Sequence, residues 1–107
     1  MKLERDLTKN PGFKKLCKGF ASLNDEKSVA ALLRDVCTIN ELIEMSGRIE
    51  AASLIKQGLS YRVINKKTGV STTTITRIAN WMNHGMGGYE LALGHHHHNS
   101  KSLTARS

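Results

Sequence analysis

Residues 59–83 read LSYRVINKKTGVSTTTITRIANWMN, and this stretch says more about the fold than any other part of the chain. Its apolar spacing predicts a helix, a tight turn at Gly69 and a second helix. Ser60 and Ser71 stand at the two helix starts, where a hydroxyl can accept a hydrogen bond from a free backbone amide. Counted from Tyr61, the apolar residues and the turn glycine have the spacing of a DNA-binding helix-turn-helix.

The inward-facing side chains of the two predicted helices follow from this spacing. They are Val63 and Ile64 on the first helix, and Ile75, Ile78, Ala79 and Met82 on the second. Asn65 departs from the pattern, because the two helices of such a motif touch at this position and a small residue is usual there. The threonine-rich run 72–76 has strand-like propensity, so a short exposed strand is the alternative. The four-residue apolar spacing that continues through Met82 favours the helix.

The outward face of the second predicted helix carries side chains of the kinds that contact DNA. Hydroxyl, guanidinium and carboxamide groups hydrogen-bond to base edges or to phosphates. Thr72 and the free amides that follow Ser71 are suited to a phosphate, because a helix N-terminus attracts anions. We therefore expect DNA contacts from Ser60, Tyr61, Arg62, Lys66, Lys67, Ser71, Thr72, Thr73, Thr74, Thr76, Arg77 and Asn80.

The net charge of +7 is distributed unevenly along the chain. Residues 1–55 hold nine basic and eight acidic side chains, whereas residues 56–83 hold five basic side chains and no acidic one. An acid-free stretch in an otherwise balanced chain indicates a surface that binds a polyanion. Arg62, Lys66 and Lys67 are the side chains that we expect to hold the phosphate backbone.

The N-terminal half predicts two short helices before a longer one. Residues 13–23 place apolar side chains at three- and four-residue spacings, which is typical of an amphipathic helix. Either Asn24 or Asp25 can cap a second helix, which ends near Cys37. Aromatic residues make up only 5% of the chain and one proline is present, so helices with an aliphatic core are favoured throughout.

A longer helix is predicted to follow. Thr38 and Glu41 have the spacing of a capping box, in which the two side chains satisfy reciprocal backbone amides. The apolar spacing continues to Gln57, and Gly58 supplies a C-terminal stop. A break near Gly47 would give two shorter helices instead, and the sequence leaves both readings open.

The chain is long enough for one small domain, which we place at residues 1–93. Near its end, Tyr89, Leu91 and Leu93 are expected to pack against the body or against a second subunit. Residues 94–107 are predicted to be a disordered tail. Its run of adjacent histidines is not expected to form a metal site, because adjacent residues present tetrahedral geometry poorly.

Several classes of protein are disfavoured. Cys17 and Cys37 are too few for a disulfide framework or a zinc site, and are expected to be small buried side chains. No apolar run has the length of a membrane span or of a secretory signal, so a cytoplasmic, nucleoid-associated protein is expected. We find no glycine-rich phosphate loop, no spaced metal ligands and no nucleophile beside a base, and therefore expect no enzyme.

The segments S-Y-R, T-G-V-S-T-T-T-I-T-R and G-G-Y-E-L-A-L stand in this order within residues 54–93. With them, the chain resembles the Trp repressor superfamily, specifically its YerC/YecD-like branch, over roughly residues 6–93. The resemblance implies an all-α, Trp-repressor-like helical bundle with a helix-turn-helix, forming an intertwined homodimer. It also implies that Asn65 is tolerated, since members of the superfamily vary at that position.

The resemblance further implies candidate effector-binding residues. In the Trp repressor, one arginine of the long central helix and one of the recognition helix enclose the amino-acid corepressor. Arg77 matches the second arginine, and Arg48 matches the first after a shift of one residue. Ile78 stands where the repressor has glycine, and its branched side chain would crowd an indole ring, which argues against tryptophan. No cofactor is required; a different small-molecule corepressor, or a phosphate contact by Arg77, are the alternatives.

Together these features predict a sequence-specific DNA-binding transcriptional regulator, a repressor by resemblance. It would read a palindromic operator in double-stranded DNA as a homodimer, because one helix-turn-helix offers few base contacts. The alternative is a helical protein-interaction module with a basic face.

Overall fold

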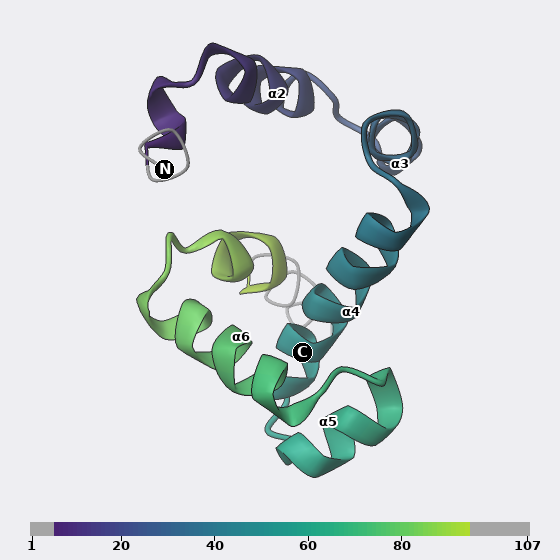
Figure 1. Cartoon of the computed structure of the whole chain (residues 1–107), viewed down its shortest axis with the longest axis vertical. Coiled ribbons are helices and arrows are strands. Elements are labelled where there is room, and N and C mark those ends of the chain that lie inside the picture. Colours follow the sequence, from purple (N-terminus) through teal and green to yellow (C-terminus); the bar gives the residue numbers. More distant parts are fainter. Residues whose placement is uncertain (1–5, 95–107) are drawn as a thin grey trace, which may run out of the picture. The chain divides into compact units, whose positions relative to one another are not determined.

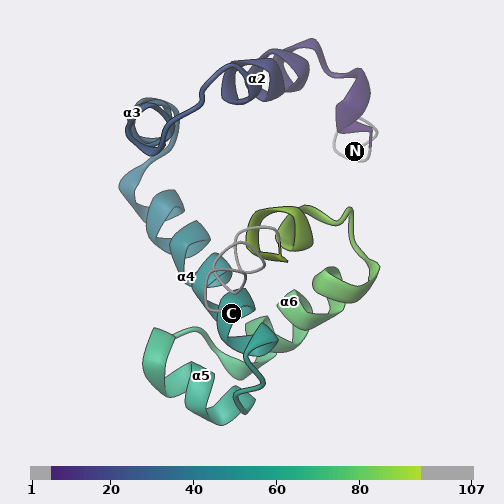
Figure 2. The ribbon, with the colours of Figure 1, turned by 180° about the vertical axis from the view of Figure 1, so that it is seen from behind.

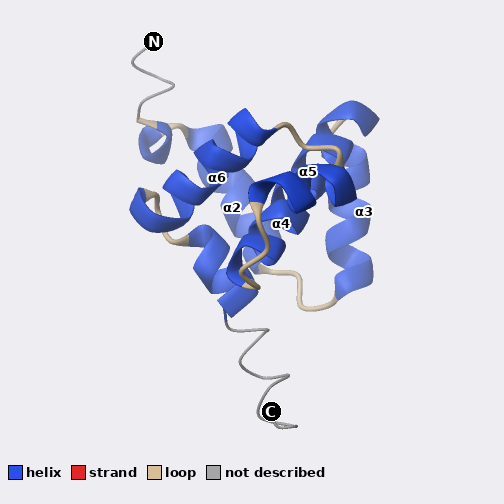
Figure 3. Ribbon diagram, turned by 90° about the horizontal axis from the view of Figure 1, so that it is seen from below, coloured by secondary structure: helices blue, strands red, loops and turns tan. Residues whose placement is uncertain are grey.

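The structure, a computed structural model, describes residues 6–94, and in that range every regular element is a helix (Figure 3). The elements are η1 (Leu7–Lys9), α2 (Pro11–Ala21), α3 (Glu26–Val36), α4 (Ile39–Lys56), α5 (Tyr61–Thr68), α6 (Thr72–His84) and the π-helix η2 (Glu90–Gly94). The predicted all-α class is confirmed. Residues 95–107, which hold nearly all of the predicted tail, lie outside the described residues. No helix of the described range is both long and apolar enough to cross a membrane.

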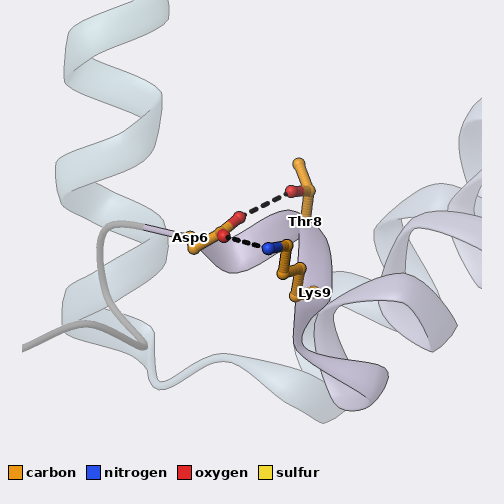
Figure 4. A network of polar contacts seen from close by, with 3 residues as sticks. All are labelled: Asp6, Thr8 and Lys9. Carbon is orange, nitrogen blue, oxygen red and sulfur yellow. Dashed lines mark hydrogen bonds and ion pairs between the residues drawn. The ribbon is translucent and has the colours of Figure 1, made fainter.

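The chain forms two compact units, Met1–Leu42 and Ile43–Ser107. In the first unit, η1 precedes α2, and its polar contacts are local. The Asp6 carboxylate accepts a hydrogen bond from Thr8 Oγ1 at 2.8 Å and pairs with Lys9 Nζ at 3.4 Å (Figure 4). These contacts are exposed, so each stabilises the fold by only a few tenths of a kcal/mol, roughly.

Helix α2 begins two residues earlier than predicted. Asn10 is its N-cap, accepting a hydrogen bond from Phe13 N at 3.0 Å, and Pro11 occupies the first helical position, where it has no amide to leave unpaired. The predicted burial of the cysteines is wrong: Cys17 is exposed and Cys37 is only partly buried. The physical reason is that amphipathic spacing fixes which face is apolar, not whether another element covers it. In residues 6–42 no side chain is buried.

The N-cap of α3 is Asp25, one of the two predicted caps. The carboxylate accepts a hydrogen bond from Ser28 N at 2.7 Å. This backbone amide, together with a side-chain hydrogen bond from Ser28, holds the pKa of Asp25 below its usual value of 3.8.

This cap makes stability depend on pH. Because the folded pKa is lowered, the cap's contribution is present above 3.8 and is lost as the pH falls through the lower folded value. We expect Asp25→Asn, which keeps the acceptor oxygen but does not titrate, to reduce the loss of stability on acidification. Urea midpoints measured from roughly pH 5 downwards, through 3.8 and below it, follow this loss. Asp35→Asn, which removes the same charge outside any cap, should leave the pH dependence of the cap intact.

Helix α4 begins at the predicted capping box. Thr38 N donates to Glu41 Oε1 at 2.8 Å, and Glu41 N donates to Thr38 Oγ1 at 3.1 Å. The helix is continuous through Gly47, so the alternative of two shorter helices is wrong. A Cβ atom at Gly47 would lie 3.2 Å from Val70 Cγ2, so the glycine serves close packing between α4 and the segment that precedes α6.

The core of the second unit joins α4, α5 and α6 (Figures 1 and 2). Its five fully buried side chains are Ala51, Ala52, Ile64, Ile75 and Ile78. Of the inward positions predicted for the two motif helices, the structure buries the three isoleucines fully, packs Met82 against them and buries Ala79 partly. Val63 is 40% exposed, because it precedes Ile64 by one position and so points about 100° away around a helix that has only one face in the core.

Beyond α6 the chain turns back towards the core (Figure 2). Tyr89 and Leu93 pack against the core cluster as predicted, whereas Leu91 is 76% exposed. Lys56 Nζ, at the end of α4, lies 3.0 Å from Glu90 Oε1. The last described helix is thus attached to the same scaffold that carries the helix-turn-helix.

Candidate nucleic-acid interface

The turn between α5 and α6 has the geometry expected of a helix-turn-helix. Gly69 adopts φ of +79°, a left-handed conformation that costs other L-residues about 1–2 kcal/mol, and its amide donates to Asn65 O at 2.8 Å. Thr68 Oγ1 donates to Ile64 O at 2.8 Å and accepts from Val70 N at 3.1 Å. Backbone groups left free by the end of α5 are therefore satisfied within the turn.

A side-chain hydrogen bond accounts for Asn65 at a position where a small residue is usual. Its Nδ2 donates to Val70 O at 2.8 Å, across the turn, and the side chain is partly buried. A small residue at this position could not make that bond. Asparagine is therefore compatible with the motif at this position, because its carboxamide fixes the path of the chain from α5 into α6.

Asn65→Ala should destabilise the fold by about 1 kcal/mol, because the partly buried carbonyl of Val70 loses its donor. Asn65→Asp keeps the shape but places an acceptor against that carbonyl, so we expect at least an equal loss. Urea unfolding measures both. Lys66→Ala, on the exposed neighbour, serves as the control and should change stability by less than about 0.5 kcal/mol; equal effects at the two positions would contradict this role for Asn65.

Helix α6 is capped by Ser71, as predicted, and the strand alternative for the threonine run is wrong. Ser71 Oγ accepts from Thr74 N at 3.1 Å and donates to Thr74 Oγ1 at 3.0 Å. Thr76 Oγ1 donates to Thr72 O at 3.0 Å. The Ser71 bonds stabilise the start of a helix whose sequence has poor helix propensity, and the Thr76 bond satisfies that hydroxyl within the helix.

The outward face of α6 is exposed at Thr73, Thr76, Arg77 and Asn80. Thr76 already uses its hydroxyl proton on the helix, whereas Thr73 and Asn80 make no side-chain hydrogen bond to any described residue. Thr73 and Asn80 are therefore the side chains of this face most available to donate to, and accept from, a base edge.

The remaining predicted contacts lie on α5 and at the two helix starts. Ser60 caps α5 through Val63 N at 3.2 Å, so its hydroxyl oxygen is engaged in the fold. Tyr61, Arg62, Lys66 and Lys67 are exposed, as are Ser71 and Thr72, while Thr74 is partly buried. Because α5 and α6 contact each other directly, the structure brings the basic and the hydroxyl side chains onto one module. The acid-free stretch reaches from Ala51 to Tyr89 in the sequence, so no carboxylate of these helices opposes a polyanion.

Only one of the two candidate effector-binding arginines lines the hollow beside the turn. A hollow of about 300 Å³ contains Arg48. Its lining residues are Ile43, Glu44, Gly47 and Arg48 of α4, together with Thr68, Gly69, Val70, Ser71 and Thr74. Arg77 is not among them and lies on the exposed face of α6. Arg48 thus stands in a mixed polar and apolar hollow beside the turn, whereas Arg77 is exposed to solvent on α6.

A second hollow was not foreseen from the sequence. Its volume is about 450 Å³, and its lining is largely apolar: Ile49, Trp81, Gly85, Met86, Gly88 and Tyr89. Trp81 is the single tryptophan of the chain and is 47% exposed. One signal in the sequence could have indicated this hollow. Trp81 lies beside the apolar stripe of α6 and not within it, so the predicted core gave this large side chain no packing partner.

Comparison with known proteins identifies a family and a relative of this chain. A model of the Trp repressor protein family matches residues 12–97. The chain is 39% identical over 72 residues to the uncharacterized protein YerC of Bacillus subtilis (strain 168), a match that covers 67% of this chain and 69% of that protein.

Two solved structures have similar folds. A TrpR-like protein from Eubacterium eligens ATCC 27750 superimposes with a TM-score of 0.77 at 33% identity, covering 84% of this chain and 93% of that one. A candidate Trp repressor from Staphylococcus aureus gives a TM-score of 0.78 at 28% identity, covering 91% and 95%.

Proposed function

We propose a function for this chain, which belongs to the Trp repressor family. It is a transcriptional regulator that binds a specific DNA operator and represses transcription. The observation that carries the proposal is the helix-turn-helix, with caps at both helix starts and a left-handed glycine in the turn. Its second helix presents exposed hydrogen-bonding side chains on the face opposite the buried isoleucines. Such a helix is suited to the major groove, where base edges carry a distinct pattern of donors and acceptors.

The two kinds of side chain on this module would have different roles. Arg62, Lys66 and Lys67 are cations that would hold phosphates, and these contacts supply affinity that falls as salt rises. Thr73 and Asn80 would contact base edges and supply sequence preference. Arg77 could serve either role, because a guanidinium can form two parallel hydrogen bonds with a phosphate or with a guanine edge.

We propose a homodimer as the functional form, with palindromic operator half-sites about one helical turn, roughly 34 Å, apart. Support comes from apolar side chains that stay exposed in the described chain: Val36 is 54%, Ile39 57% and Ile43 63% exposed. The described part of the first unit has no buried side chain, and such amphipathic helices need a partner surface. A second copy supplies one and doubles the number of base contacts.

This assembly predicts a dimer mass in sedimentation equilibrium at micromolar concentration. Ile43→Glu should shift the distribution towards monomer, because a charge would replace an exposed apolar side chain at the proposed interface. Glu44→Gln on the neighbouring exposed position is the matched control and should leave the mass unchanged. A stable, folded wild-type monomer would rule out the dimer.

An effector is proposed for the hollow that contains Arg48, whose guanidinium would bind an anionic group of the ligand. Glu44 in the same lining could hold a cationic group. Tryptophan is not proposed, because Arg77, the counterpart of the second arginine that encloses it in the Trp repressor, does not line this hollow.

The function is tested by selecting random duplex DNA with the full chain and sequencing the enriched pool. A palindrome with half-sites one turn apart is the expected result. Salt-sensitive binding without enrichment would replace this proposal with non-specific DNA binding, and absence of any DNA binding would overturn it in favour of a protein-interaction module.

A further inference from the structure

Helix α2 carries a basic face that the helix-turn-helix does not explain. At about 100° per residue, Lys14, Lys15 and Lys18 fall within one arc of the helix, and Phe13, Leu16 and Phe20 fall on the opposite side. All three lysines are exposed. Residues 7–24 contain no acidic side chain, so the arc has one sign of charge only.

Lys14 and Lys15 do not stabilise their own helix, whereas Lys18 lies in its last turn, where a cation is favourable. The ion pairs within residues 6–94 join Lys9 to Asp6 and Lys56 to Glu90, so none of the three lysines of α2 has a carboxylate partner there. Lys14 and Lys18 stand four positions apart, where like charges repel. The first turn of α2 has no acidic residue to favour the helix N-terminus. The arrangement is therefore one that an external anion would stabilise.

Other described helices of this chain have a different charge pattern. In α3 two acids, Glu26 and Asp35, balance Lys27 and Arg34, as on an ordinary solvated face. In α4 acids outnumber bases. Among the α-helices of residues 6–94, only α2, α5 and α6 lack acids altogether. Helix α2 thus shares its charge pattern with the proposed DNA interface and with no other α-helix.

We infer that Lys14, Lys15 and Lys18 form a second DNA-contacting surface, which binds backbone phosphates of the duplex without reading its sequence. The inference rests on the proposed function and adds a contact surface that lies outside the helix-turn-helix. Duplex DNA presents about one negative charge per 1.7 Å of its axis, so a helix face with cations alone is complementary to it. Lysine ammonium groups act as point charges towards phosphate and carry no base preference.

The test measures the affinity of the full chain for its selected duplex and for a shuffled duplex as a function of salt. We expect Lys14→Gln/Lys15→Gln/Lys18→Gln to weaken binding to both duplexes by the same factor. The slope of log affinity against log salt should become shallower by about 0.9 for each phosphate that the variant no longer neutralises. The triple arginine variant at the same positions keeps the charge and should keep the wild-type slope.

A matched control removes two cations from the mixed face of α3, as Lys27→Gln/Arg34→Gln, and should leave the slope unchanged. If the glutamine triple loses helix content by circular dichroism, Lys15→Gln alone is used, with an expected change in slope of about 0.9. A wild-type slope in the glutamine variant would overturn this surface while leaving the proposed function intact. Absence of salt-dependent DNA binding by the wild type would overturn both. Loss of binding to phosphatidylglycerol vesicles with an unchanged DNA slope would assign the face to a membrane and also overturn the inference.

Discussion

Ile75→Ala should lower the free energy of unfolding by about 2–5 kcal/mol, the range for removing a fully buried isoleucine side chain and leaving a cavity. Ile75 is one of five fully buried side chains of the second unit, and it packs α6 against its neighbours. A domain of this size has a total stability of roughly 5–15 kcal/mol, so this one substitution removes a large share of it. Urea unfolding followed by circular dichroism, at one fixed protein concentration, measures the change.

Thr73→Ala is the control on the same helix, two residues before Ile75. Because Thr73 is exposed and makes no side-chain hydrogen bond to a described residue, its loss should change stability by less than about 0.5 kcal/mol. A change below about 1 kcal/mol for Ile75→Ala would show that α6 does not pack through this residue.

The second large effect concerns DNA discrimination. Thr73→Ala/Asn80→Ala should reduce the preference for the selected duplex over a shuffled one by about 1–3 kcal/mol for each base that the variant no longer contacts. The salt slope should stay at its wild-type value, because neither side chain neutralises a phosphate. Equilibrium binding to both duplexes over a range of salt concentrations measures the two quantities together.

Lys66→Ala/Lys67→Ala is the complementary variant on α5. It should weaken binding to both duplexes equally and make the salt slope shallower by about 0.9 per phosphate, with the preference unchanged. An unchanged preference in the Thr73 and Asn80 variant would mean that α6 does not read bases.

The helix-turn-helix was predictable because its signals are local. The caps at Ser60 and Ser71 and the left-handed Gly69 each act within four residues, and the structure confirms all three. The start of α2 was equally local, with Asn10 followed by proline, yet the apolar spacing that begins at Phe13 placed it two residues late. Local chemistry therefore located most helices, to within two residues of their ends.

Burial, the hydrogen bond across the turn and the hollow beside Arg48 depend on tertiary contacts. Burial of Val63 was expected from spacing and burial of Cys17 from the residue type, but burial requires a covering element that neither supplies. The bond from Asn65 to Val70 O depends on how the turn folds back, and its role could not be read from the identity of the residue. The hollow beside Arg48 requires α4 to approach the turn at Gly47, which is a tertiary contact.

The central claim is that this chain reads a DNA sequence, and competition at about 150 mM salt tests it most directly. The duplex enriched from a random pool competes for the full chain against a shuffled duplex of the same length and composition. We expect a preference of at least about 10³-fold for the enriched duplex, the lower end for specific DNA-binding proteins. Equal affinity for the two duplexes would contradict the claim.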